Sequence, residues 1–63
     1  MKYVLRHKEH KTYYCFDKEI GRRFLVDGSK AYKFRLESSA AKMRGKFNHP
    51  ENWDIIEVKN GNN

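Results

Sequence analysis

Residues 12–26, TYYCFDKEIGRRFLV, constrain the fold more than any other segment, because they predict a β-hairpin. Residues 12–16 and 22–26 are rich in the side chains that favour strands. Gly21 lies between them and can adopt the positive φ that closes a short hairpin loop. The same segment interleaves aromatic rings with Arg22 and Arg23. These rings therefore form either a small core or a surface that binds nucleic acid.

The remaining elements follow from the hydrophobic pattern on either side of the hairpin. Residues 2–7 predict a first strand and residues 52–58 a fourth. Between hairpin and fourth strand, a stripe at helical spacing predicts a helix over residues 38–47, with Ser38 as its N-cap. The stripe consists of Leu36, Ala40, Met43 and Phe47. We therefore expect an α+β fold in the order β-β-β-α-β, an antiparallel sheet of three to four strands packed on one helix. A single domain over residues 1–58 precedes a flexible tail, 59–63.

Strand alternation divides the side chains between two faces of this sheet. The face predicted to receive the helix consists of Tyr3, Leu5, Tyr14, Phe16, Phe24 and Val26. The opposite face then presents Lys2, Arg6, Tyr13 and Arg23, with Val4, Cys15 and Leu25 among them. So short a chain needs most of its aromatic residues as core. Tyr13 is the ring that remains outside, among basic residues.

The charge of the chain is concentrated in its first half. The net charge is +6, and residues 1–35 contain ten Lys and Arg against four Asp and Glu. Such an excess attracts polyanions, although it also keeps a small domain soluble. The apolar stretches are shorter than a membrane span or the core of a signal peptide, so we expect a cytoplasmic protein without membrane contact. The single cysteine, Cys15, fits a reducing compartment.

The sequence predicts neither catalysis nor a metal or other cofactor. His7, His10 and Cys15 are close in the chain, but they match no standard zinc spacing. A cysteine in the middle of a strand is more often a small buried hydrophobe than a nucleophile. Trp53 is expected to cover one end of the core, and its alternative role is an anchor for a protein partner.

The best candidate site is the basic sheet face. Its predicted nucleic-acid-binding residues are Lys2, Arg6, Lys11, Tyr13, Arg22 and Arg23. Lysine and arginine contact phosphates, while a tyrosine stacks on a base. Alternation directs Arg6, Tyr13 and Arg23 away from the helix, whereas Arg22 lies at the hairpin end, where either direction is open. The alternative is a solvent-exposed face without a ligand.

Two resemblances bear on function. The segment AYKFRLESSAAKM with NWDIIEV resembles small, largely uncharacterised proteins encoded by phages and prophages of Gram-positive bacteria, through Ala31, Phe34, Ala40 and residues 53–58. Those proteins commonly have a Ser or Thr cap where this chain has Leu36.

The architecture is also similar to the arm-type DNA-binding domains of tyrosine recombinases. The positions that would match are Tyr13, Arg22 and Arg23, and the fourth strand departs from that pattern. The first resemblance implies an accessory phage gene product, and the second implies DNA binding by analogy of fold.

Two functions are therefore expected. The first is a small non-catalytic module that binds nucleic acid through its basic sheet face. The alternative is a phage accessory protein that binds and modulates or inhibits a host protein through a surface around Tyr32, Trp53 and Ile55. The sequence indicates no small-molecule substrate, and it leaves the oligomeric state and the choice between DNA and RNA open.

Overall fold

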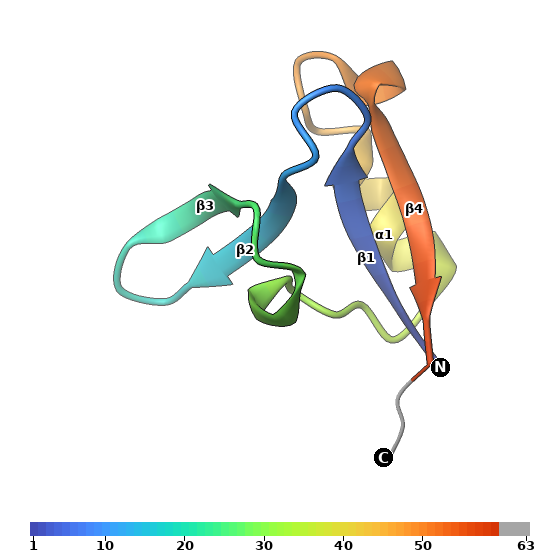
Figure 1. The fold of residues 1–63 in the computed structure, drawn as a ribbon. Helices are drawn as coiled ribbons and strands as arrows, with labels where there is room; N and C mark the ends of the chain where they lie inside the picture. Colours follow the sequence, from blue (N-terminus) through green and yellow to red (C-terminus); the bar gives the residue numbers. More distant parts are fainter. Residues whose placement is uncertain (60–63) are drawn as a thin grey trace.

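Strands β1 and β4 form the regular part of the sheet. In the computed structural model, which describes residues 1–59, β1 (Lys2–His7) pairs antiparallel with β4 (Trp53–Val58) in six consecutive registered pairs, from Lys2↔Val58 to His7↔Trp53. Helix α1 (Glu37–Arg44) contacts both strands, and Figure 1 shows it lying behind them. Residues 60–63, most of the predicted tail, lie outside the described residues.

The predicted hairpin is present and projects away from α1. It consists of β2 (Tyr13–Asp17) and β3 (Gly21–Leu25), and Gly21 has the expected positive φ of 94°. The Asp17 carboxylate accepts the backbone N–H groups of Glu19 and Ile20, which fixes the turn. The strand order β3-β2-β1-β4 completes a four-stranded antiparallel sheet, so the predicted α+β class and the order of elements are confirmed.

The sheet opens between its two central strands. Among the described residues, Arg6↔Tyr13 is the one registered pair between β1 and β2. Residues 31–34 fill the opening: the N–H of Tyr32 donates to the carbonyl of Tyr14 at 2.9 Å, and Tyr3 and Phe34 exchange two backbone hydrogen bonds at 2.7 and 2.8 Å. A short 3-10 helix, η1 (Gly28–Lys30), leads into this segment and contacts β2. A second, η2 (Pro50–Asn52), precedes β4.

The helix is shorter than predicted at its C-terminal end. It begins after Leu36, which makes no side-chain capping bond, so Ser38 is not the N-cap. It ends at Arg44, because the N–H groups of Lys46 and Phe47 donate to the carbonyls three residues earlier, of Met43 and Arg44, and so tighten the chain into turns. Phe47 therefore reaches the core from the turn after the helix. Leu36 was expected in the buried stripe and is instead 61% exposed, since it precedes the first turn.

The core lies between α1 and the face of the sheet that alternation predicted. It is formed by Leu5, Tyr14, Phe34, Ala40, Phe47 and Trp53, with Tyr3, Met43 and Ile55 packed against it. Trp53 is 8% exposed, so the prediction of a core cover is confirmed and that of an exposed anchor is wrong. Val4 and Cys15 are also buried, on the opposite face. No helix among the described residues is long and apolar enough to cross a bilayer.

Three residues predicted as core are substantially exposed. Phe16 is 52% exposed and Phe24 47%, because α1 covers β1 and β4 and leaves the hairpin partly uncovered. Val26 is 73% exposed and follows the last residue of β3. The rings were assigned to the correct face of the sheet, but the short helix does not extend over all of it.

Candidate functional site

The structure brings together two of the predicted binding residues on the sheet face opposite the helix. Arg6 and Tyr13 are register partners, and the guanidinium carbon of Arg6 lies 5.7 Å from the centroid of the Tyr13 ring. Arg23 lies on the same face, opposite Cys15 on the neighbouring strand. This face, which we call the outer face, therefore contains Arg6, Tyr13 and Arg23, as alternation predicted.

Tyr13 is less open than predicted. The Gly28 backbone passes so close to the ring that a Cβ on Gly28 would lie 3.0 Å from its Cζ. Arg6 is half-buried beside it, and its Nε is buried without a hydrogen-bond partner. The ring is thus held between η1 and Arg6, because Gly28 allows η1 to approach β2 closely. A base cannot stack freely on a ring packed in this way.

Arg22 lies on the other side of the sheet, toward the helix. It is opposite Phe16 in the hairpin register, and its guanidinium carbon lies 5.9 Å from the centroid of the Phe47 ring. The analogy with recombinase arm domains required Arg22 on a common surface with Tyr13 and Arg23. Arg22 does not lie on that surface. Lys2 is half-buried at the start of β1, and Lys11 is exposed in the β1–β2 turn with a φ of 59°.

Around Arg22 the structure forms a groove that the sequence did not predict, which we call the Arg22 groove. It runs between β3 and the segment after α1 and has a volume of about 290 Å³. Its lining consists of His7, Arg22, Phe24, Lys46, Phe47, Asn48, His49, Asn52 and Trp53. Cationic and amide side chains thus surround an aromatic floor.

The floor is a compact cluster of three rings. The centroid of Trp53 lies 4.7 Å from that of Phe47 and 5.4 Å from that of Phe24. Phe24 and Phe47 meet edge to face at 6.1 Å. Phe47 and Trp53 are buried, whereas Phe24 leaves about half of its surface exposed. The buried rings hold Phe24 in place while part of it stays accessible.

The electrostatic environment of the groove is positive. Among residues 1–59, no Asp or Glu lines it. One carboxylate lies at the rim, where Glu51 Oε2 is 3.6 Å from His49 Nδ1. The field of Arg22 also reaches the core: burial raises the pKa of the Tyr14 hydroxyl above its ordinary value of 10.0, and Arg22 partly offsets that rise.

Sequence reasoning missed this groove although one signal was present. Arg22 and Phe24 are two residues apart in one strand, so they share a face, and Phe24 had been assigned to the core side. Phe47 belonged to the predicted helix stripe and was therefore expected on the same side of the sheet as Phe24. Extending the alternation by one residue to Arg22 would have brought Arg22, Phe24 and Phe47 together.

The His7–His10–Cys15 segment forms no metal site in the described part of the chain, where no group of three or more His, Cys, Asp or Glu is arranged around a common point. The rings of His7 and His10 pack at 4.5 Å, and His7 Nδ1 accepts the backbone N–H groups of Glu9 and His10. Cys15 is buried, and its thiol donates to the carbonyl of Tyr13 at 3.5 Å. These contacts account for the three side chains as parts of the turn and the sheet.

Comparison with known proteins adds no relative. No family model, curated protein or solved structure matches this chain. The resemblances to phage proteins and to recombinase arm domains therefore stay predictions, and the functional argument depends on the geometry of the Arg22 groove.

Proposed function

We propose that this protein is a small non-catalytic basic module that binds nucleic acid, and that the Arg22 groove is its contact site in place of the predicted outer face. The observation that carries the proposal is the combination of Arg22 and Lys46 with the half-exposed ring of Phe24 in a lining where, among the described residues, no carboxylate occurs. Nucleic acid presents both complements, anionic phosphates and flat bases, within one nucleotide.

Each part of the groove has a physical role in this binding. The Arg22 guanidinium and the Lys46 ammonium neutralise phosphates, so that the affinity falls steeply with salt as counterions are released. Phe24 offers a ring for a base, a contact that contributes about 1–3 kcal/mol. Asn48 and Asn52 add amide groups at the groove wall. Because Phe47 and Trp53 pack against the Phe24 ring, this side chain should lose little conformational entropy on binding.

The test compares two neighbouring arginines that face opposite sides of the sheet. Arg22 lines the groove, and Arg23 lies on the outer face opposite Cys15. Arg22→Ala should weaken binding of a labelled oligonucleotide and lower the slope of log K against log salt by about one, while Arg23→Ala should change both much less. Both arginines are exposed, so both variants should fold, and circular dichroism checks that they do.

Two results would decide against the proposal. A folded parent protein that binds neither DNA nor RNA at low salt is not a nucleic-acid-binding module. Equal losses for Arg22→Ala and Arg23→Ala would return the site to the outer face. Phe24→Leu gives an independent check, since it removes stacking and should weaken binding without changing the salt slope.

A second candidate function, contact with a host protein, is favoured by the exposed apolar side chains of the hairpin and the α1 entrance. Phe16, Ile20 and Leu36 are 52%, 66% and 61% exposed. Tyr32 remains available for such a contact, whereas Trp53 is buried and Ile55 half-buried. Salt-independent binding to a protein, with no binding to oligonucleotides, would favour this function over the first.

A further inference from the structure

We propose, on the basis of the nucleic-acid function above, that the ligand is a single strand and that it continues from the Arg22 groove across Phe16 and Tyr32 to a second basic site around Lys33 and Arg35. Of the nucleic-acid-binding residues predicted from the sequence, this second site contains only Lys2. Three adjoining hollows on the helix side of the hairpin carry the inference.

The middle hollow is apolar and adjoins the Arg22 groove. It has a volume of about 220 Å³ and is lined by Tyr14, Phe16, Tyr32 and Met43. The hairpin register joins the two: Phe16 is directly opposite Arg22, and Tyr14 is directly opposite Phe24. Paired residues share one face of the sheet, so the groove and the middle hollow are parts of one surface.

The second basic site adjoins the middle hollow at Tyr32, which lines both. It has a volume of about 770 Å³, and its lining consists of Met1, Lys2, Tyr32, Lys33, Phe34, Arg35, Leu36 and Ser39. Lys33 and Arg35 are exposed. As in the Arg22 groove, no Asp or Glu among residues 1–59 is part of the lining. Cations therefore lie at both ends of the surface, with aromatic rings between them.

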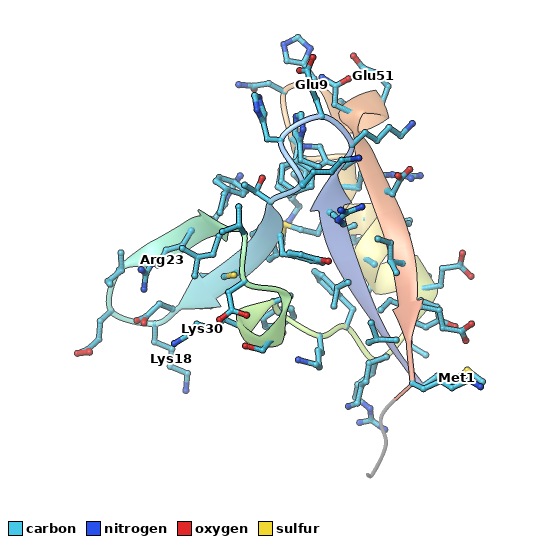
Figure 2. The ribbon with its side chains drawn as sticks, viewed as in Figure 1. Met1, Glu9, Lys18, Arg23, Lys30 and Glu51 are labelled. Atoms are coloured by element: carbon cyan, nitrogen blue, oxygen red, sulfur yellow. The ribbon has the colours of Figure 1, made fainter. Side chains whose placement is uncertain are left out.

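Five of the eight Asp and Glu side chains have other positions or partners. Glu9 and Glu51 lie at the end of the molecule formed by the β1–β2 turn and η2 (Figure 2), and a fourth hollow at that end contains both Glu51 and Asp54. The carboxylates of Asp17 and Asp27 accept backbone N–H groups in their own turns. No Asp or Glu among the described residues lines any of the three hollows, although Glu37 directly follows Leu36 of the second basic site.

The exposed rings in the middle indicate a single strand. Phe16 and Tyr32 are 52% and 44% exposed, and a ring binds a base only through the flat face that a duplex conceals by stacking. A duplex offers phosphates to the cations and leaves these rings in water. The two basic sites lie at opposite ends of β1, where His7 lines one and Lys2 the other. That separation is roughly 16 Å at the usual rise of a strand, which requires several nucleotides.

The experiment measures fluorescence anisotropy of labelled oligo-dT and oligo-U of about two and about eight nucleotides, and of a duplex of the longer length, lengths that bracket the site sizes of small single-strand-binding folds. The variant is Lys33→Ala/Arg35→Ala. Its matched control is Lys18→Ala/Lys30→Ala, which removes the same charge from exposed positions that line none of the three hollows. Figure 2 labels both lysines.

The expected result separates the two ends. The parent should bind the longer single strand more tightly than the duplex or the short oligonucleotide. Lys33→Ala/Arg35→Ala should weaken only the longer strand and lower its salt slope by about 1.4, at about 0.7 for each lost phosphate contact. The control should change the slope much less. Parallel losses with oligo-dT and oligo-U would indicate that the phosphates and the pyrimidine rings, which both ligands share, make the contacts.

The failures of this inference and of the proposed function are distinguishable. If Arg22→Ala abolishes binding but Lys33→Ala/Arg35→Ala matches its control, the proposed function stands and the second site is wrong. If the duplex binds as tightly as the single strand of equal length, the single-strand inference is wrong. If the folded parent binds no oligonucleotide at low salt, both fail at the proposed function.

Discussion

The two halves of this sheet are both built from antiparallel strands, but they differ in how far their side chains are buried. In the packed half, formed by β1, β4 and α1, Leu5 and Ala40 are completely buried and six registered pairs connect the strands. In the hairpin half, formed by β2 and β3, Phe16 and Phe24 remain about half exposed. Strands β1 and β4 lie against α1, and the hairpin half projects beyond the helix (Figure 1).

The comparison shows how a small domain divides its hydrophobic residues. A chain of 63 residues buries only about 60% of the surface that its unfolded form exposes, so some apolar rings must stay at the surface. Here those rings are concentrated on the hairpin, beside Arg22 and Tyr32. The stability of the domain is therefore expected to depend on the packed half, and ligand contact on the hairpin half.

Substitutions in the two halves should differ most in their effect on the free energy of unfolding. Leu5→Ala removes a completely buried side chain from the packed half and should cost about 2–5 kcal/mol, comparable with the total stability of so small a domain. Phe16→Ala removes a larger side chain from the hairpin half and should cost about 1 kcal/mol or less, because the ring is half exposed. Urea unfolding of both variants measures the difference.

Equal losses in the free energy of unfolding for Leu5→Ala and Phe16→Ala would contradict this difference between the halves, since the hairpin would then be as important for stability as the core. If Leu5→Ala is unfolded, Leu5→Val extends the measurement, because it removes a smaller volume from the same place. Phe16→Ala should meanwhile weaken binding of the longer single strand.

An intermediate effect is expected at the hairpin turn. Gly21 has a φ of 94°, so Gly21→Ala forces a side chain into the left-handed region at a cost of about 1–2 kcal/mol. Gly45→Ala is the matched control in the packed half: Gly45 has a helical φ of −65°, and an added Cβ meets no atom closer than 3.5 Å. That substitution should stabilise the domain by about 0.4–1 kcal/mol. Thermal melts that show the same sign for both glycines would contradict the assigned turn.

The smallest effect concerns Asp27, which joins the hairpin to η1. Its carboxylate accepts the Ser29 hydroxyl at 2.7 Å and the Ser29 N–H at 3.0 Å, and these bonds lower the pKa of Asp27 below its ordinary 3.8. Because the folded pKa is the lower one, the resulting stabilisation is present above pH 3.8 and is lost as the pH falls through the folded value. Asp27→Asn should therefore melt below the parent at neutral pH, and the gap should narrow in acid. A gap that is constant from neutral to acidic pH would exclude the linkage.

Much of the fold was predictable because local signals and topology agree. Residues 2–7 were predicted as a strand and form β1, and Gly21 was predicted to close the hairpin and does. The end of the helix was not predictable, since Phe47 satisfies the helical spacing whether it lies on the helix or in the turn after it. Leu36 likewise fits the stripe, and only the backbone shows that it precedes the first turn.

The site was less predictable than the fold for a related reason. Alternation placed Arg6, Tyr13 and Arg23 on the correct face. It could not show that η1 returns over Tyr13, because that contact joins segments without a shared pattern. Lys33 and Arg35 follow the hairpin in an irregular segment, where no periodicity assigns them a direction. The structure adds that they line one hollow together with Lys2 of β1, because the chain path brings this segment beside the start of β1.

The opening between β1 and β2 leaves aromatic side chains to join much of the two halves of the sheet. Among the described residues, Arg6↔Tyr13 is the one registered pair between these strands, and the Tyr14 ring packs against Phe34 and Phe47. Phe24 of the hairpin adds a contact with Trp53, at 5.4 Å between ring centroids. The rings that form the floor of the Arg22 groove therefore also attach the hairpin to the packed half.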